Sequence, residues 1–300
     1  MNPARKPVRK AVIAAAGFGT RFLPQTKAMP KEMLPLIDKP IIQYVVEELV
    51  EAGIKDIIII SGSNKRSIED HFDLPNQDLV ANLVAGGPKK APLLDAIDNI
   101  ANLANFVYVR QKGPYGNATP IMNAEHLVGD EPFIYTFADD FFASSPGRTR
   151  QLIDAYNEYE GSVFACKTAV SDDEYDRYGF VHGEHVSDGV LKADRIIEKP
   201  GKANSPSDMA SVSGYLLTPD VFRYIEKAIP GLEDGKEFQI QPIMQKMMDD
   251  GLPFYAKQIT GGTYHDTGDK LEYLKTVVHF ALEREEIRDD FREYLKKVVS

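Results

Sequence analysis

The chain has 300 residues, of which 43% are hydrophobic and 27% charged, as is usual for a globular protein with a sizeable core. Its net charge of −10 at pH 7 argues against partners such as nucleic acid or an anionic membrane surface. No stretch is long and apolar enough to span a bilayer, and the single cysteine, Cys166, excludes an internal disulfide. We therefore expect a cytoplasmic protein of a reducing compartment.

The first predicted element is a buried strand, AVIAAA at residues 11–16, after a basic tail that we expect to be disordered. A glycine-rich run follows it, GFGTRFLPQTKAMPKEMLP at residues 17–35. A glycine turn at the end of a buried parallel strand exposes backbone N–H groups to an anion. Because Arg21, Lys27 and Lys31 add positive charge there, the run predicts a cradle for a nucleoside triphosphate.

Other interpretations of this run stay open. A P-loop is excluded because the string GxxxxGK[ST] does not occur, and a dinucleotide fingerprint lacks its third glycine, where Phe22 stands. Asp38 is at a suitable distance for a ribose-binding acid, but it lies in PLIDKP, a proline-flanked turn. A nicotinamide dehydrogenase and a purely structural turn are therefore the two rivals.

Strand-like and helix-like segments alternate after this run, which favours βαβ units and a parallel sheet. In the first half we expect strands at residues 56–61, 106–111 and 132–138, and helices at residues 41–52, 65–72, 91–102 and 119–128. In the second half we expect strands at residues 162–170, 211–217 and 256–259, an antiparallel layer at residues 179–199, and helices at residues 238–250, 270–286 and 288–299.

Several polar residues lie where chemistry is expected. Asp139 ends the strand at residues 132–138, where it is equally well explained as a Mg²⁺ ligand or as a helix N-cap. Asp266 follows a predicted strand in TYHDTGD, whereas the neighbouring His265 fits a packing role better. Glu198 and Lys199 precede a proline, so we expect an extended backbone there; ordinary surface charges are the simpler explanation.

The glycine-rich run resembles the signature GxGTRxxPxTxxxPKxxLP of the sugar-nucleotide pyrophosphorylases. Its extension, TKAMPKEMLPLIDKPIIQYVVEE, is similar to the bacterial UTP–glucose-1-phosphate uridylyltransferases, and the resemblance runs from about Lys10 to about His279. It implies an α/β fold of the nucleotide-diphospho-sugar transferase type: a Rossmann-like, mixed, mainly parallel sheet flanked by helices, with a small β-rich sugar-binding layer. It also implies a single domain over residues 1–287, with a nucleotide-binding half near 10–140, a sugar-phosphate half at 141–287 and a C-terminal amphipathic helix at 288–300.

The resemblance implies a reaction as well. UTP and glucose 1-phosphate would give UDP-glucose and pyrophosphate by Mg²⁺-dependent nucleotidyl transfer, in a homodimer or homotetramer. Because a phosphomonoester is largely ionised at neutral pH, the sugar phosphate can attack the α-phosphorus without a general base. The metal ligands would be Asp139 and Asp266, with Asp140 secondary. Lys199 would hold the sugar phosphate, Arg21 the β- and γ-phosphates and Lys31 the α-phosphate.

The remaining roles implied by the resemblance concern the two substrates. The nucleotide would contact Ala15, Ala16, Gly17, Gly19, Thr20, Gln111 and Gly116. The sugar would contact Gly179, Glu198 and Gly214, and a glycine within a strand pattern independently suggests a close approach. The chain departs from the family pattern at Gly116–Pro120, GNATP, where G-L-G-H-A is usual, and at Ala138. Alternatives are therefore dTTP or another hexose 1-phosphate as substrate, or a catalytically silent nucleotide-sugar-binding paralogue.

Overall fold

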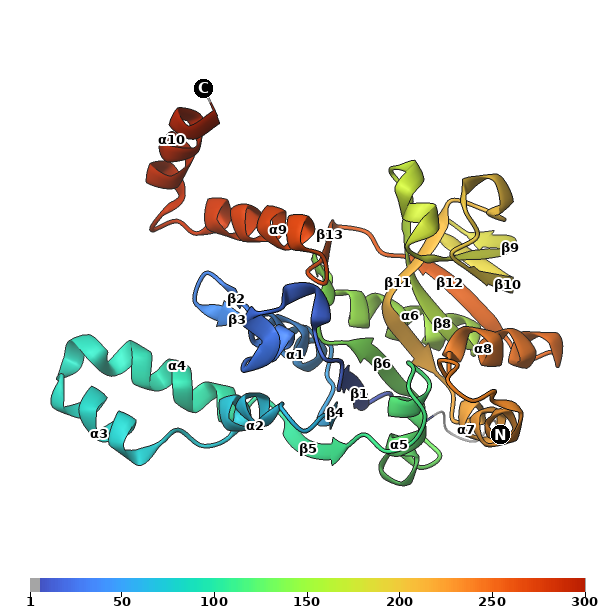
Figure 1. Cartoon of the computed structure of the whole chain (residues 1–300), viewed down its shortest axis with the longest axis horizontal. Helices are drawn as coiled ribbons and strands as arrows, with labels where there is room; N and C mark the ends of the chain where they lie inside the picture. The colour runs from blue at the N-terminus through green and yellow to red at the C-terminus, as the bar shows by residue number, and fades with distance from the viewer. Residues whose placement is uncertain (1–5, 300) are drawn as a thin grey trace.

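A computed structural model describes residues 6–299, so residues 1–5 of the predicted disordered tail lie outside the described residues (Figure 1). The first half of the chain forms four parallel strands in the order β5 (Asn105–Arg110), β4 (Asp56–Ser61), β1 (Lys10–Ala15) and β6 (Phe133–Phe137). Val12 lies opposite Ile58 on one side and Tyr135 on the other. The predicted strands and their parallel pairing are confirmed.

The same sheet continues through the second half of the chain. After β6 come β11 (Met209–Leu217), β8 (Ser162–Thr168), β12 (Phe254–Gln258), β10 (Val190–Glu198) and β9 (Gly179–Ser187). β11 and β10 run against the other strands of this sheet, which is therefore mixed and mainly parallel, as predicted. The hairpin of β9 and β10 is the antiparallel layer expected at residues 179–199.

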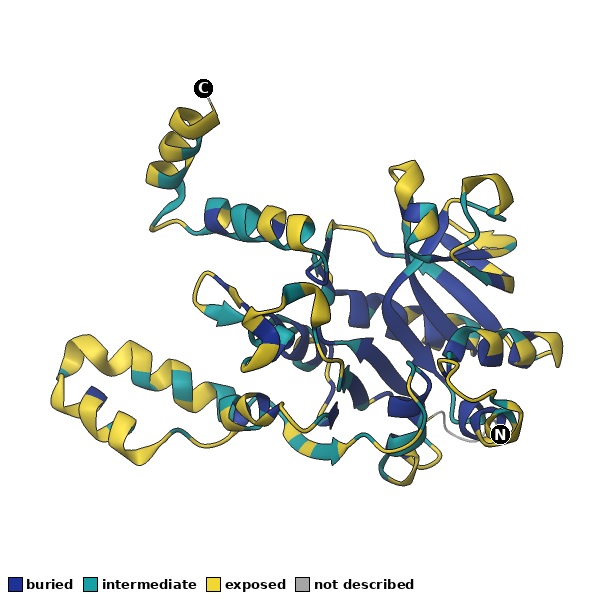
Figure 2. Ribbon diagram, in the orientation of Figure 1, coloured by how far each residue is buried: buried dark blue, intermediate teal, exposed yellow. Residues whose placement is uncertain are grey.

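Helices cover both faces of the sheet, and the sheet itself is the buried centre of the molecule (Figure 2). Alternation along β1 sends Ala11 and Ile13 to one face and Val12 to the other. The first face is covered by α1 (Ile41–Glu51) and α6 (Arg148–Tyr159). The second is covered by α5 (Thr119–Val128), α7 (Asp220–Ala228) and α8 (Ile240–Asp249).

Other elements lie outside the sheet and the helices that cover its two faces. α2 (Arg66–Phe72) leads into an exposed pair of helices, α3 (Gln77–Ala85) and α4 (Ala91–Ala101), of which only α4 was predicted (Figure 1). The sequence analysis also missed α6, α7 and the antiparallel ribbon of β7 (Asp140–Ser144) with β13 (Gly262–Asp266). A short ribbon joins β2 (Pro35–Leu36) to β3 (Lys39–Pro40), and the chain ends in α9 (Lys270–Glu283) and α10 (Arg288–Val299). Single 3-10 turns occur at Thr20–Phe22, Gln25–Lys27, Lys31–Met33, Pro88–Lys90, Asp172–Asp176, Lys202–Asn204 and Ile229–Gly231.

Within residues 6–299, none of the helices has the length and apolar character needed to cross a membrane.

Candidate active site

The glycine-rich loop leaves the carboxyl end of β1, between β4 and β6 in the sheet, and is held by two side-chain hydrogen bonds. Thr26 Oγ1 donates a hydrogen bond to the Gly19 carbonyl at 2.7 Å. Arg21 Nη1 donates one to the Gly268 carbonyl at 3.2 Å, which ties the loop to the turn between β13 and α9. Ligands in open α/β sheets bind beyond the carboxyl ends of the strands, and this loop lies there.

A first cavity, of about 220 Å³, lies between this loop and the segment after β5. Four of the predicted nucleotide-binding residues line it: Ala16, Gly17, Gln111 and Gly116. Ala15, Gly19 and Thr20 are not among its lining residues, and Ala15 is buried in the core. The cavity is lined further by Ala14, Lys31, Glu32, Tyr115, Asn117, Pro120, Tyr135, Phe137 and Asp139.

A second cavity, of about 480 Å³, meets the first at Phe137 and Asp139, which line both. It brings together Arg21, Lys199, Asp139 and Asp266, which stand far apart in the sequence. Asp140, Asp176, Arg177, Tyr178, Tyr264, Gly268 and Asp269 complete its lining. A substrate that extends from one cavity to the other would therefore pass Asp139.

Asp139 is ion-paired with Lys31, whose ammonium group hydrogen-bonds to its Oδ2. Burial lowers the pKa of Lys31, but the charges of Asp139 and Glu32 more than offset this effect and leave that pKa raised. Lys31 thus stays charged at neutral pH, at the point where the two cavities meet.

Asp139 and Asp266 face the same small space. A methyl group placed on Gly268 would lie 3.1 Å from Asp139 Oδ2, 3.2 Å from Asp266 Oδ1 and 3.5 Å from Arg21 Nη1. Groups of three or more His, Cys, Asp and Glu side chains suited to a metal do not occur within residues 6–299. Mg²⁺ commonly takes one or two protein carboxylates and fills its shell with phosphates and water, so these two residues fit such an ion.

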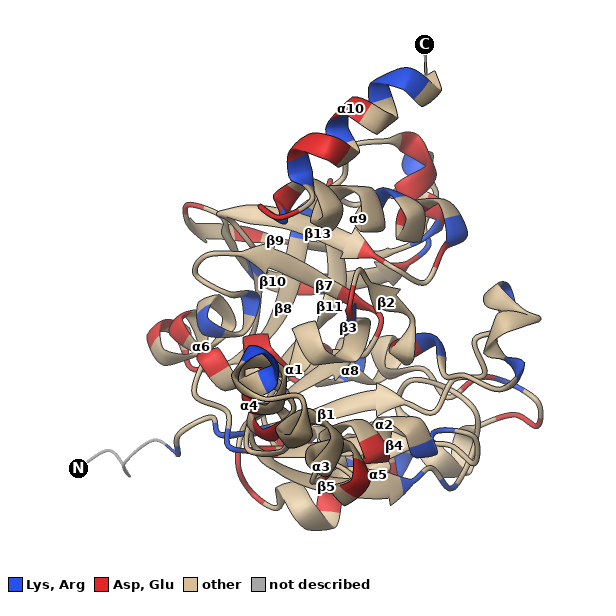
Figure 3. Cartoon of the chain, turned by 90° about the vertical axis from the view of Figure 1, so that its left-hand side faces the viewer, with Lys and Arg blue, Asp and Glu red and all other residues tan. Residues whose placement is uncertain are grey.

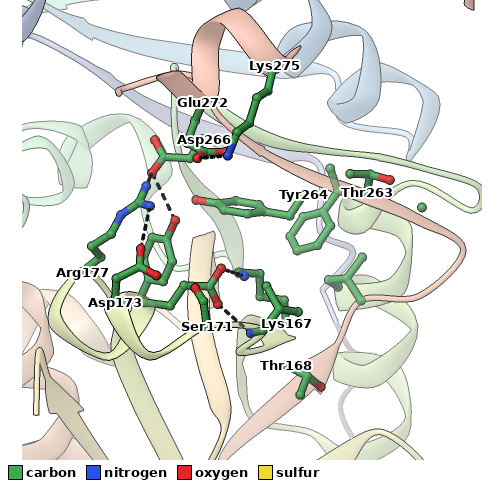
Figure 4. Close-up of a pocket in the computed structure, with 16 residues that line it drawn as sticks. Lys167, Thr168, Ser171, Asp173, Arg177, Thr263, Tyr264, Asp266, Glu272 and Lys275 are labelled. Carbon is green, nitrogen blue, oxygen red and sulfur yellow. Dashed lines mark hydrogen bonds and ion pairs between the residues drawn. The ribbon is translucent and has the colours of Figure 1, made fainter. Parts of the chain in front are cut away.

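Asp266 already has partners in this structure (Figure 4). Its Oδ2 accepts hydrogen bonds from Arg177 Nη2 at 2.5 Å and from the Tyr178 hydroxyl at 3.1 Å, and its Oδ1 accepts one from the Gly268 N–H at 3.0 Å. Arg177 also lies 3.7 Å from Asp173. These contacts line a third cavity, of about 630 Å³, on the far side of Asp266. Arg177 was not predicted from the sequence, although it lies two residues before Gly179, in the string RYG at residues 177–179.

Asp140 lines the second cavity next to Asp139, but one of its oxygens is held by protein groups. Its Oδ2 accepts hydrogen bonds from the Ser213 N–H and the Tyr264 hydroxyl, both at 3.0 Å, which ties β7 to β11 and β13. Burial, then the neighbouring Asp139 and Asp266, raise the pKa of Asp140 to about 7. Oδ2 of Asp140 is thus committed to protein contacts, whereas its buried Oδ1 has no hydrogen-bond partner within the described residues.

His265 is a packing residue. It is 5% exposed and lies against Phe141 and Phe280, with ring centroids 5.4 Å away in both cases. Burial, with His279 nearby, lowers its pKa to about 4, so the ring is neutral. The interpretation given to it from the sequence is confirmed.

The backbone at Lys199 is not extended, so that prediction is wrong. Its φ is +48°, in the left-handed region, although Pro200 follows it. The Lys199 N–H donates a hydrogen bond to the Tyr178 carbonyl at 3.0 Å, and this tertiary contact outweighs the local preference. The side chain lines the second cavity.

The predicted sugar-binding residues lie near this position but do not line either of the first two cavities. A methyl group on Gly179 would lie 2.9 Å from Glu198 Oε2, so the two residues are in contact across the hairpin. Gly214 has a φ of +110°, and a Cβ there would clash with the Tyr135 carbonyl of β6. The group that approaches Gly214 closely is therefore the backbone of the neighbouring strand, β6.

This arrangement of a basic glycine loop, two joined cavities and paired carboxylates is that of a nucleotidyl transferase, and residues 10–282 match the nucleotidyl transferase family. The chain is 40% identical over 295 residues to a UTP–glucose-1-phosphate uridylyltransferase of Bacillus subtilis (strain 168), covering 98% of both chains. A solved UDP-glucose pyrophosphorylase complexed with UDP-glucose is 36% identical, with a TM-score of 0.81, covering 92% of this chain and 100% of that one. A UTP-bound enzyme of the same type from Acinetobacter baumannii is 32% identical, with a TM-score of 0.85, covering 96% of this chain and 98% of that one.

The chain thus belongs to the nucleotidyl transferase family and, within it, to the UTP–glucose-1-phosphate uridylyltransferases. The predicted fold class and family are confirmed, and the dehydrogenase interpretation is wrong. Asp38, in the turn between β2 and β3, instead pairs with Arg284 at the end of α9.

Proposed function

We propose that this protein converts UTP and glucose 1-phosphate into UDP-glucose and pyrophosphate. The observation that carries the proposal is the junction of two cavities at Asp139, with Lys31, Arg21 and Lys199 around it. The relatives named for this reaction, and solved relatives holding UDP-glucose or UTP, support it.

The chemistry is a direct displacement at the α-phosphorus of UTP by an oxygen of the sugar phosphate, with pyrophosphate leaving. The attacking oxygen is already largely ionised at neutral pH, so the protein has to overcome repulsion between two polyanions. It does this by placing cations around them and by fixing their orientation. Lys31 neutralises the α-phosphate, Arg21 the leaving pyrophosphate and Lys199 the sugar phosphate.

Magnesium belongs to this proposal, with Asp139 and Asp266 as its protein ligands. When bound, it would supply positive charge beside the reacting phosphates. Lys31 and Arg177 pair with these two carboxylates, whose oxygens lie beside Gly268.

The other residues implied by the family resemblance are assigned to the substrates. Gln111 and Gly116 would contact uracil, because an amide can both donate to and accept from its edge. Ala16, Gly17, Gly19 and Thr20 would present backbone to the phosphates, with Ala15 supporting them from the end of β1. Gly179, Glu198 and Gly214 would receive the hexose.

A dTTP-using enzyme, or one for another hexose phosphate, is the second candidate. It rests on the unusual segment Gly116–Pro120, which is tied to α8: Asn117 Oδ1 accepts a hydrogen bond from the Ile240 N–H at 2.8 Å. A silent paralogue is disfavoured because Arg21, Lys31, Asp139, Lys199 and Asp266 all border the joined cavities.

The test is pyrophosphate release with a panel of nucleoside triphosphates and sugar 1-phosphates, with and without Mg²⁺. UTP with glucose 1-phosphate should give the highest kcat/KM. Faster release with dTTP would support the second candidate, and no release with any pair would support the silent paralogue.

Assembly and location complete the proposal. We expect a homodimer or homotetramer in the cytoplasm, where nucleoside triphosphates are made, with residues 1–287 as one catalytic domain. Residues 10–140 would hold the nucleotide and residues 141–287 the sugar phosphate. α10 has no buried residue, and it carries acidic residues in its first turn and basic ones in its last (Figure 3). Such a helix is a suitable contact between copies, which light scattering of the full chain and of a chain ending at residue 287 would test.

A further inference from the structure

Two large aromatic side chains are exposed beside the first cavity. Phe18, in the glycine loop, is 56% exposed, and Tyr115, in the segment after β5, is 55% exposed. Their rings stack on each other, with centroids 5.7 Å apart and planes inclined by 28°. They join two segments that form opposite sides of the cavity: Gly17 lines it next to Phe18, and Tyr115 lines it directly.

The segments that carry these rings are hydrogen-bonded close to each ring. The Tyr115 carbonyl accepts a hydrogen bond from the Phe238 N–H at 2.6 Å, and Gly116 is pressed so closely on Phe238 that a Cβ would clash with its backbone. On the other side, Gly19 is held by Thr26 Oγ1 at 2.7 Å and by the Phe22 N–H at 3.0 Å. The rings can therefore part by side-chain rotation while the walls of the cavity stay in place.

The lining of the cavity suits a nucleobase, which aromatic rings can bind by stacking. Its other lining includes Gln111, an amide suited to a base edge, while the cations lie toward Asp139 at the opposite end. Tyr115 lines the same cavity as Gln111, so its ring is available to a planar base bound there. Stacking of a base on an aromatic side chain is sequence-tolerant and strengthens binding of the base.

We propose that Phe18 and Tyr115 form an aromatic clasp across the mouth of the nucleoside cavity. The clasp opens to admit a nucleoside triphosphate and closes over its base, so that it slows dissociation of the nucleotide. This inference rests on the proposed function, because it takes the first cavity as the site of the base. It assigns to the two rings a positioning role that is separate from the charged groups at the phosphates.

The test compares the binding of UTP with that of inorganic tripolyphosphate, in Phe18→Ala, Tyr115→Ala, Tyr115→Phe and the double alanine variant. Affinity is measured by calorimetry and the dissociation rate by stopped flow, without sugar phosphate so that turnover cannot occur. We expect each alanine variant to bind UTP roughly tenfold more weakly, through faster dissociation. Tripolyphosphate should bind all variants equally, because it lacks a base.

The stacking of Phe18 on Tyr115 predicts two further results. The double variant should lose little more than either single variant, since the rings act as one unit. Tyr115→Phe should bind UTP like the unmodified protein, because the clasp uses the ring and not the hydroxyl. Leu74→Ala, which removes an apolar side chain 73% exposed elsewhere, is the matched control.

Unchanged or tighter UTP binding in the alanine variants would overturn the clasp. So would equal losses for UTP and tripolyphosphate, since these would point to a disturbed glycine loop. In either case the unmodified protein would still turn over UTP and glucose 1-phosphate. Failure of the unmodified protein to release pyrophosphate would instead refute the proposed function.

Discussion

The ammonium group of Lys31 is hydrogen-bonded to the carboxylate of Asp139, 108 residues further along the chain, at the junction of the two cavities. A residue proposed to neutralise the nucleotide and a residue proposed to hold a metal thus neutralise each other in this structure. Arg177 and Asp266 repeat this arrangement on the other side of Gly268. Substrate and metal would therefore each take over a charge that already has a partner.

Neutralising either carboxylate should remove metal-dependent turnover. We expect Asp139→Asn and Asp266→Asn each to lower kcat by about 10²–10³, by analogy with the loss of one preorganised electrostatic contact. The measurements are initial rates over a range of MgCl₂ concentrations, and Mn²⁺ binding by electron paramagnetic resonance in the presence of UTP. Asp173→Asn, at a side chain 69% exposed and 3.7 Å from Arg177, is the control and should stay close to the unmodified rate. Full activity in excess chelator would contradict the proposed metal site.

Lys199→Ala should impair the reaction with glucose 1-phosphate far more than the binding of UTP. Since this side chain lines only the second cavity of the joined pair, we expect turnover with glucose 1-phosphate to fall by about 10²–10³ while UTP binding largely survives. Steady-state kinetics and calorimetry of UTP binding check this. Lys202→Ala removes a cation paired with Asp172 at the surface and should have little effect. An equal loss of UTP affinity and turnover would refute the role assigned to Lys199.

The buried pair of Arg148 and Glu48 should matter for stability. The two side chains are 0% and 9% exposed, and Arg148 Nη2 lies 2.7 Å from Glu48 Oε2. Glu48→Gln would leave a buried guanidinium without its counter-charge, which we expect to lower the free energy of unfolding by about 3–5 kcal/mol. Asp70→Asn, in the exposed pair with Arg66, should cost less than about 1 kcal/mol. Urea unfolding of both variants tests this contrast, and equal shifts would contradict it.

Cys166 should be inert in the folded protein. It is fully buried on β8, and burial raises the pKa of its thiol well above the ordinary value. We expect no reaction with a disulfide reagent at neutral pH, and reaction of one thiol per chain once urea unfolds the protein. Rapid labelling without denaturant would reveal local opening of β8, which lies between β11 and β12 in the sheet.

Local pattern was enough to predict much of this fold. The continuous apolar run DIIIIS gave β4 with its observed ends, and the helical spacing of Ile42, Val45, Val46 and Leu49 gave the buried face of α1. α6 was missed because it is mostly polar in sequence, and its buried Arg148 and Gln151 find several of their partners in segments distant in the chain, such as Glu48 and Thr260. α3 was missed although most of its residues are apolar; it lies on the surface, and only its Leu83 is buried.

The candidate site was predicted unevenly for a related reason. Asp139, Asp266 and the basic loop could be named from motifs, and the structure brings them to one place. Arg177 and Tyr178 could not, because their contact with Asp266 joins residues 88 or more positions apart. The left-handed backbone at Lys199 was also unpredictable, since the contact that enforces it comes from Tyr178 on another segment.

The position of β11 has a consequence for how the protein is made. This strand lies between β6 and β8, so the strands of the two halves of the chain cannot join into one sheet until Leu217 has left the ribosome. A nascent chain halted before that point would carry unpaired strand edges and exposed apolar surface. Folding on the ribosome should therefore be largely deferred, and shortened chains ending before β11 should aggregate or be degraded.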